Sequence, residues 1–445
     1  MTIPAGEVAD LLVQLIGNRC VNDGTPGSGG EVRSADTLDA YLGVTGERIV
    51  PAPGRVSVVY RLPGDPDLPA MMLMGHTDVV PAGEGWTVDP FAAERRDGFV
   101  WGRGAIDMLD QTAAMAAVFR RALSGGVRYP GDLVFLAAAD EEAGGRLGAR
   151  HLVEEHWDVV QTDLLLTEIA TPALEGAHGP GVPVTVAEKG PQWRRLRSGG
   201  TAGHGSQPYG ADNALVPLAA AMWRLGTVPS TPVMTDEWHR FVAAWDPPDG
   251  LAAELLDPKR VDEAIARIAA TDPGMARWVH ACTHLTVSPN LMQAGVKANV
   301  IPDRGVAEID VRVLPGQDPA AVRQHFEETV GGLGGLEYEE VESTTAGGSP
   351  PEGPLWEAIT AALATHAPGH HPIPTMIPVG TDARFFRPKG VVAYGVGLMD
   401  SRIGFGDFLR MFHGPDERVS EASLGLTADL YVEILQRLGA AFGEL

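Results

Sequence analysis

The chain has 445 residues, more than one hydrophobic core usually serves, so we expect two domains. Its 58 acidic and 34 basic residues give a net charge of -24, which disfavours nucleic-acid and membrane-surface partners because such a surface repels phosphates. Two isolated cysteines, an N-terminus without a basic and then apolar region, and the lack of an apolar run of about 18 residues together indicate a cytoplasmic protein without disulfides or membrane spans.

Short apolar runs separated by helical stretches fill the first part of the chain. The spacing of apolar residues predicts helices over 6–17 and 109–124. Strands are expected in the apolar runs at 55–60, 69–74, 132–139 and 163–167. Apolar strands without alternation are typical of a sheet that is buried on both faces. We therefore predict an α/β domain with a mixed, mostly parallel sheet flanked by helices.

A different pattern begins near residue 184, where polar and apolar residues alternate. It predicts strands at 184–188, 192–198, 283–288 and 305–313, and helices at 212–225 and 318–330. These elements form a compact α+β unit. The segment 226–282 is too long for a plain connection, so it should carry its own structure, including a helix over 259–270.

The last part of the chain returns to the first pattern. The glycine-rich run 346–353 is typical of a linker, and a helix, a strand and a closing helix are expected at 354–365, 391–397 and 420–440. The predicted organisation is therefore one domain, 1–185 and 348–445, interrupted by a smaller α+β domain at 186–347 with an insertion at about 226–282.

Histidine and acidic residues occur where predicted strands end. His76, in Gly75-His76-Thr77-Asp78, follows an apolar strand, where open α/β sheets place their sites, and Asp78 could orient its imidazole. For this fragment alone, a histidine satisfied by a turn is an equal interpretation. Asp107 ends a glycine-rich stretch just before a helix and, taken alone, fits a helix N-cap better than a ligand.

Three consecutive acids, Asp140, Glu141 and Glu142, follow another apolar strand. They repel one another, so a neutralising cation is favoured over a solvated turn. Adjacent side chains point in different directions, so that one can bind metal while its neighbour handles a proton. With Glu168 and His413, the set offers nitrogen and oxygen ligands suited to zinc or a similar ion. Two metals that share one carboxylate can clamp and activate a water.

The order His-x-Asp, Gly-Arg-Gly-x-x-Asp, Asp-Glu-Glu-x-Gly-Gly, a distant acid and a late histidine resembles the aminoacylase, carboxypeptidase G and cytosolic dipeptidase family. Succinyl-diaminopimelate desuccinylase and acetylornithine deacetylase belong to the same group, and the match covers essentially the whole chain. The resemblance implies two divalent ions per chain, zinc by ligand type, with cobalt or manganese as alternatives. It implies that Asp107 bridges them, that His76 and Glu168 complete one site, and that Glu142 and His413 complete the other.

The resemblance also implies catalytic roles. Glu141 would be the general base that deprotonates the attacking water and later protonates the leaving nitrogen, and Asp78 would assist catalysis beside His76. Gly203-His204-Gly205-Ser206-Gln207-Pro208 looks like the lid motif of the family. There, His204 would polarise the scissile carbonyl in the active site of a partner subunit. The interrupting domain would thus be a lid and dimerisation domain, and the domain around it the catalytic one.

Further positions resemble contacts to a substrate carboxylate: Asn299, Arg312, Gly380, Thr381 and Arg384. A free carboxylate favours a guanidinium fork and backbone donors. For Arg312 and Arg384 separately, a surface ion pair is an equally good interpretation. The family commonly has a glycine pair before this threonine, whereas the chain has Val379-Gly380.

The predicted function is metal-dependent hydrolysis of an amide bond in a dipeptide or N-acyl amino acid by a homodimer. Phosphoester hydrolysis is a rival that would want a basic anion cradle near the acids. A catalytically silent relative that binds ligands or partners is another alternative. A third is a self-sufficient monomer, in which the segment 226–282 covers the edge of the lid.

Overall fold

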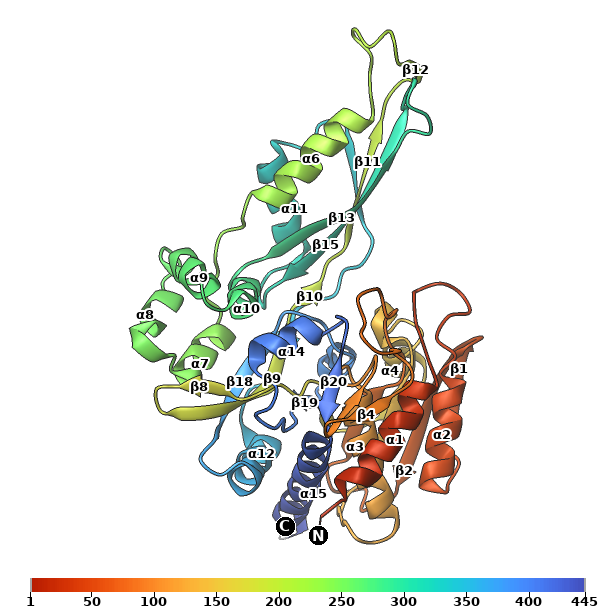
Figure 1. The fold of residues 1–445 in the computed structure, drawn as a ribbon, viewed down its shortest axis with the longest axis vertical. Helices are drawn as coiled ribbons and strands as arrows, with labels where there is room; N and C mark the ends of the chain where they lie inside the picture. The colour runs from red at the N-terminus through yellow and green to blue at the C-terminus, as the bar shows by residue number, and fades with distance from the viewer. Residues whose placement is uncertain (1, 444–445) are drawn as a thin grey trace.

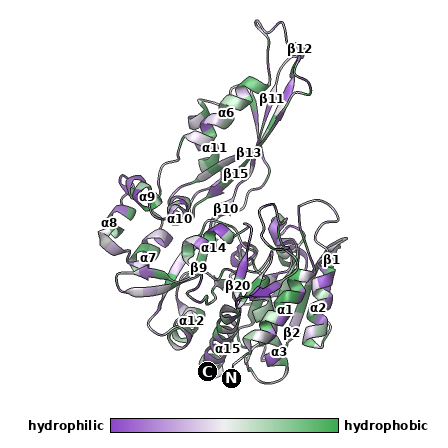
Figure 2. Ribbon diagram, in the orientation of Figure 1, coloured by the Kyte–Doolittle hydropathy of each residue, from purple (hydrophilic) through white to green (hydrophobic). Residues whose placement is uncertain are grey.

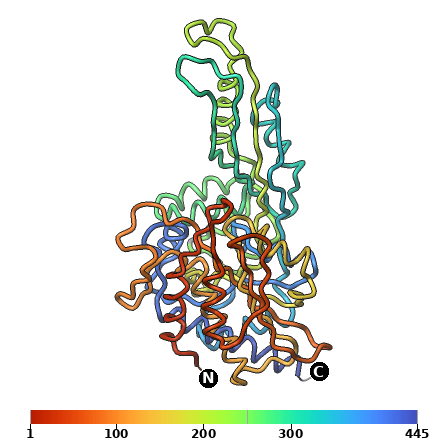
Figure 3. Tube along the Cα trace, turned by 90° about the vertical axis from the view of Figure 1, so that its right-hand side faces the viewer, coloured from red at the N-terminus to blue at the C-terminus, as the bar shows by residue number. Residues whose placement is uncertain are grey.

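A computed structural model describes residues 2–443 and divides them into a larger body and a narrower lobe that projects from it (Figure 1). The view turned by 90° shows the lobe standing away from the body as well (Figure 3). Hydrophobic residues occur in both parts (Figure 2), because each has a core of its own. Within the described residues, no helix has the length and apolarity needed to cross a membrane.

The body is built on a ten-stranded sheet in the order β1-β2-β6-β3-β7-β19-β9-β17, with β8 and β18 also paired to β9. Its central strands β6, β3, β7 and β19 run parallel to one another. The bounds are β1 (Glu47–Ala52), β2 (Arg55–Leu62), β3 (Met71–His76), β6 (Leu133–Ala138), β7 (Leu164–Thr167), β8 (Leu174–Gly176), β9 (Gly179–Glu188), β17 (Gly347–Gly348), β18 (His371–Ile377) and β19 (Val392–Gly395). The predicted α/β class with a mainly parallel central sheet is confirmed.

Helices cover both faces of this sheet. One face packs against α1 (Ala5–Gly17), α2 (Val32–Leu42), α3 (Leu109–Leu123), α12 (Gly353–His366), α14 (Phe405–Met411) and α15 (Glu421–Gly443). The other packs against α4 (Ala149–Glu155), α5 (Trp157–Val160) and α13 (Ala383–Phe386). The sequence of β3 is uniformly apolar because both of its faces are buried. Met71 and Leu73 pack in the core on one face of the sheet, and Met72 and Met74 pack in the core on the other.

The lobe has a five-stranded antiparallel sheet in the order β10-β15-β11-β16, with β13 also paired to β15. The bounds are β10 (Gly190–Pro191), β11 (Arg194–Gly199), β13 (Thr286–Ala294), β15 (Arg304–Val313) and β16 (Leu336–Glu340). Buried and less buried residues alternate along β15, as expected for a sheet with one covered face. Helices α6 (Leu215–Thr227) and α11 (Pro319–Val330) cover that face, and β12 (Gly203–His204) pairs with β14 (Val300–Ile301) at the tip.

The segment 226–282 forms helices that pack on the body rather than on the lobe core. They are α7 (Asp236–Trp245), α8 (Ala252–Leu255), α9 (Val261–Ala269) and α10 (Pro273–Thr283). Helix α9 corresponds to the helix expected over 259–270. Trp238, Phe241 and Trp278 belong to the same core as the large sheet, and Trp245 donates a 2.9 Å hydrogen bond to the carbonyl of Glu175 in β8.

A small three-stranded sheet completes the body. It consists of β4 (Glu94–Arg96), β5 (Phe99–Trp101) and β20 (Arg418–Ser420), with β5 in the middle. This sheet joins the chain that leads to Asp107 with the chain that leaves His413. Both of these residues were predicted from the sequence as metal ligands.

Candidate functional site

The five predicted metal ligands lie together at one edge of the large sheet. His76 is the last residue of β3, Glu168 follows β7, and Glu142 lies just after β6. Because β3, β6 and β7 are parallel, their carboxyl ends meet at the same edge. Asp107 comes from the loop before α3, and His413 from the loop after α14.

Asp107 is central to the cluster. One of its carboxylate oxygens, Oδ1, lies 3.3 Å from Nε2 of His76, and the other, Oδ2, lies 2.8 Å from Nε2 of His413. His76 Nε2 is also 3.9 Å from Glu168 Oε2, and His413 Nε2 is 3.3 Å from Glu142 Oε2. Two groups, each of one histidine and one glutamate, therefore flank a shared aspartate. Asp107 does not cap α3, whose N-cap residue is Met108.

Asp78 holds this edge of the sheet in place. Its backbone carbonyl accepts a 2.9 Å hydrogen bond from His76 Nδ1, which leaves Nε2 facing Asp107. Its carboxylate accepts hydrogen bonds from the backbone N–H groups of Glu141, at 3.2 Å, and Glu142, at 3.1 Å. Asn22 Nδ2 donates to the same carboxylate at 2.8 Å. Asp78 thus orients both the histidine and the turn that carries the two glutamates.

A buried ion pair fixes the loops of Asp107 and His413. Arg103 donates to Glu417 at 2.6 Å and to the backbone carbonyl of His413 at 3.1 Å. The other carboxylate oxygen of Glu417 accepts from the backbone N–H of Ile106 at 2.8 Å. Both side chains of the pair are at most 1% exposed, so removal of either one would leave the other as an unpaired buried charge.

The cluster is strongly acidic for its burial. The side chains of Asp107, Glu141, Glu142 and Glu168 are between 4% and 11% exposed. Burial raises the pKa of Glu141 and Glu168, and burial together with the nearby Asp107 raises the pKa of Glu142 to about 8. Such a group of carboxyl groups gains most from divalent cations, and oxygen and imidazole donors suit zinc.

The neighbouring carboxylates also change the pKa of His413. Burial lowers its pKa, but hydrogen bonds to Asp107 and Glu142 outweigh this effect and raise the pKa to about 11. Ligand atoms of His76, Asp107 and Glu142 lie within 4.8 Å of one another, as do those of His76, Glu141 and Glu168. By distance alone, Glu141 is therefore a possible ligand as well as a possible base.

A cavity of about 130 Å³ opens beside the acids. It is lined by Asp107, Glu141, Glu142, Glu168 and His413, and also by Arg312, Gly380 and Arg384. We call it the metal cavity. It brings three of the five predicted substrate contacts beside the predicted ligands.

The two arginines of the metal cavity have different surroundings. Arg384 is 6% exposed and donates to the carbonyls of Thr381, at 2.8 Å, and Gly144, at 2.9 Å, which excludes a surface ion pair. Its guanidinium lies 3.6 Å from Glu141 Oε1. Arg312 is paired with Asp310 at 2.8 Å and keeps a quarter of its side chain exposed.

The remaining predicted site residues lie elsewhere. His204, in β12, and Asn299, which directly precedes β14, are exposed at the tip of the lobe, far from the body (Figure 1). Thr381 is buried, and its backbone N–H donates a hydrogen bond to the carboxylate of Glu188. It is not among the residues that line the metal cavity. Within one chain, the structure does not bring His204 to the cluster.

Several residues of the site were not among the residues predicted from the sequence, including Trp193, Phe412 and Asp382. Trp193 and Phe412 line the metal cavity. Asp382 is buried, neither of its oxygens has a hydrogen-bond partner among the described residues, and its pKa is raised by burial and by Glu141. The position of Phe412 before His413 was a usable signal, whereas nothing in the sequence around Trp193 pointed to the site.

Glycine is required where β19 passes Glu168. A Cβ atom at Gly395 would lie 1.6 Å from the backbone carbonyl oxygen of Glu168, and backbone atoms cannot rotate away. We expect Gly395→Ala to destabilise the protein by about 3 kcal/mol or more, because overpacking against backbone forces the strands apart. Thermal or denaturant unfolding measures this. Gly347→Ala, on another strand with nothing within 4 Å of its Cβ position, should be nearly neutral, and equal effects of the two would contradict the steric argument.

Comparison with known proteins gives the cluster a context. Residues 72–437 match the model of peptidase family M20/M25/M40. The chain is 27% identical to aminoacylase-1 of Mus musculus, with 95% of this chain and 93% of the relative covered. It is 26% identical to succinyl-diaminopimelate desuccinylase of Rhodospirillum centenum, with 93% of each chain covered.

Solved structures share the fold at low sequence identity. A metallo-carboxypeptidase of the M20 family from Sulfolobus solfataricus superposes with a TM-score of 0.75 at 16% identity, covering 98% of this chain and 99% of the other. Human carnosine dipeptidase 1 gives a TM-score of 0.71 at 16% identity, covering 98% and 96%. The body and the lobe are therefore both part of a known architecture.

Proposed function

Since the chain belongs to peptidase family M20/M25/M40, we propose that it hydrolyses an amide bond in a small substrate with a free carboxylate, a dipeptide or an N-acyl amino acid. The observation that carries the proposal is the shared aspartate, Asp107, between two histidine–glutamate pairs in a cavity faced by two arginines. The relatives named aminoacylase and desuccinylase support the same reaction class. A silent relative would have lost the base or a ligand, whereas each of these positions is filled.

The donor set fits two divalent metal ions. We propose that Asp107 would be shared by the two ions, that His76 and Glu168 would complete one site, and that Glu142 and His413 would complete the other. The short distances from Asp107 to both histidines and the acidity of the cluster support this assignment. When bound, such ions supply Lewis acidity, which polarises a carbonyl and lowers the pKa of water.

The residues of the chain then divide the proton transfers and the binding. Glu141 takes a proton from the attacking water as the water oxygen bonds to the carbonyl carbon, and returns it to the nitrogen as the C–N bond breaks. Its raised pKa suits both steps. Arg312 and Arg384, which line the same cavity, bind the substrate carboxylate.

The lobe tip supplies the remaining group. We propose that two chains pair through their lobes and that His204 enters the active site of the partner, where it polarises the scissile carbonyl. The exposure of His204 and of Tyr209 and Val296 beside it, 103% and 96% exposed, supports a surface that is covered in a dimer. The helices α7–α10 pack on the body, and so leave this tip uncovered.

Metal content tests the proposal directly. Elemental analysis of gently purified protein should find about two equivalents of a divalent metal, zinc by ligand type. A chelator should remove the hydrolysis of dipeptides and N-acyl amino acids, and added zinc, cobalt or manganese should restore it. Glu142→Ala, purified alongside, should hold less metal. Full activity in verified metal-free protein would end the hypothesis.

A further inference from the structure

A second, apolar cavity of about 140 Å³ adjoins the metal cavity. Aromatic and aliphatic side chains make most of its wall, chiefly Ile169, Trp278, Phe405, Phe408, Leu409 and Phe412. Among its described lining residues none is charged, and the only polar side chains are the threonines Thr171, Thr185 and Thr375. An ionised group would lose its hydration there without gaining a partner. We call this space the apolar cavity.

The apolar cavity adjoins the proposed reaction site. Val379 and Phe412 line both it and the metal cavity. Ile169 follows the proposed ligand Glu168, and the ring of Phe412 stacks on that of His413 with centroids 5.0 Å apart. A group bound in the apolar cavity therefore lies within a few atoms of the bond that the metal cavity exposes to attack.

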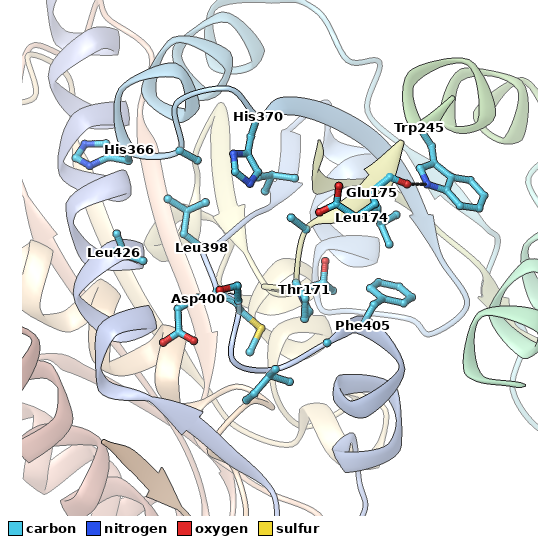
Figure 4. A pocket seen from close by; sticks show the side chains of 18 of the residues that line it. Thr171, Leu174, Glu175, Trp245, His366, His370, Leu398, Asp400, Phe405 and Leu426 are labelled. Atoms are coloured by element: carbon cyan, nitrogen blue, oxygen red, sulfur yellow. Dashed lines mark hydrogen bonds between the residues drawn. The ribbon is translucent and has the colours of Figure 1, made fainter. Parts of the chain in front are cut away.

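The apolar cavity also adjoins a third cavity. A larger cavity of about 690 Å³ shares Thr171, Leu174 and Phe405 with it, as Figure 4 shows for the larger space. The Thr171 hydroxyl has no hydrogen-bond partner among the described residues. No hydrogen bond from this side chain therefore fixes the wall between the two cavities. Phe405, half-buried and on a short helix, is the largest side chain common to both spaces.

We propose that the apolar cavity receives an unbranched or aromatic acyl group of about six carbons, so that the substrates are N-acyl amino acids with an apolar acyl chain. This inference rests on the proposed function. Arg312 and Arg384 line neither the apolar cavity nor the larger one, so the carboxylate end stays in the metal cavity. The acyl group and the amino-acid side chain remain, and of these the acyl group is bonded directly to the carbonyl carbon that is attacked. A cavity of roughly 150 Å³ lined by such side chains holds a benzene ring, which sets the size.

Two substrate series test the proposal. With N-acyl amino acids of one fixed residue, each added CH₂ from acetyl to hexanoyl should raise kcat/KM about fourfold, equivalent to about 0.8 kcal/mol, and on the order of 10² in all. With N-acetyl amino acids of increasing side-chain length, kcat/KM should change much less. A flat acyl series with measurable hydrolysis overturns the proposal, and so does a rise confined to the side-chain series, which would assign the cavity to the side chain.

A variant pair tests the cavity itself. Phe405→Ala should join the apolar cavity to the larger one and shift the preferred acyl length from about six carbons toward ten. Phe91→Ala removes a ring of equal size that is also half-buried but lines neither cavity, and should leave the preference unchanged. An unchanged preference in Phe405→Ala, or the same shift in both variants, contradicts the assignment.

Binding separates this inference from the proposed function. Titration calorimetry should show hexanoate binding at least tenfold more tightly than acetate to the wild-type protein, whether or not an amide is hydrolysed. If no N-acyl amino acid or dipeptide is cleaved and yet hexanoate binds preferentially, the proposed reaction fails and the cavity assignment stands. Equal affinities for the two acids overturn the cavity assignment, even in an active enzyme.

Discussion

Glu141→Gln should keep its metal and its affinity for substrate while kcat falls by roughly 10²–10⁴-fold, the usual contribution of a general base. The glutamine preserves the size of the side chain and one oxygen, but it cannot take the proton of the attacking water. The backbone N–H of Glu141 is held by Asp78, which the substitution leaves in place. Steady-state kinetics with metal analysis of the same preparation measures both quantities.

The matched variant is Glu142→Gln, the neighbouring position on the same turn. Glu142 Oε2 lies 3.3 Å from His413 Nε2, so this change should lower metal content as well as turnover. Glu141 lies close enough to His76 and Glu168 to be a ligand itself. If Glu141→Gln loses metal as Glu142→Gln does, Glu141 is a ligand. If it keeps near-normal turnover, the base is another group.

His204→Ala should lose on the order of 10²–10³ in turnover, because a donor aimed at the developing oxyanion is typically worth this much. In one chain His204 is exposed at the lobe tip, so a role in catalysis requires a second chain. Inactive His204→Ala mixed with inactive Glu141→Ala, mildly unfolded and allowed to pair again, should recover roughly a quarter of wild-type activity. In a twofold dimer each mixed pair has one site with both groups.

The control for this experiment is subunit exchange itself. Chains with two different tags should be captured together after the treatment, which shows that mixed pairs exist. If they exist and no activity returns, His204 does not act across a dimer. Wild-type protein carried through the same treatment gives the activity to which the quarter is compared.

Part of the cluster was predictable because His76, Glu142 and Glu168 follow apolar runs that were predicted as strands. A mostly parallel sheet was expected, and parallel strands place their carboxyl ends at one edge. That β3 and β7 are neighbours in it comes from the structure. The order of the motifs then resembled a family whose model matches most of the chain. The family match does not test the roles of the individual residues, and these roles stay predictions.

Other parts of the site could not be derived in this way. Trp193 reaches the metal cavity from the lobe, and Trp278 reaches the apolar cavity from α10, so both depend on how distant segments pack. The helices of 226–282 were not assigned to the body, because aromatic residues such as Trp238 pack equally well against any apolar surface. The carboxylate of Asp382 has no hydrogen-bond partner among the described residues, and no sequence pattern indicates this.

The placement of α7–α10 on the body bears on how readily two lobes can meet. The chain enters the lobe after β9, leaves it between α6 and α7, returns between α10 and β13, and leaves again before β17. Lys189 is fully buried where the chain first enters the lobe after β9. It donates hydrogen bonds to the carbonyls of Ala281 and His284 at 2.9 and 2.7 Å, and so joins this connection to the one between α10 and β13. A lobe anchored through several connections samples fewer orientations than one on a single pair of linkers. Less rotational freedom is then lost when two lobes associate, which favours tighter pairing for a given area of contact.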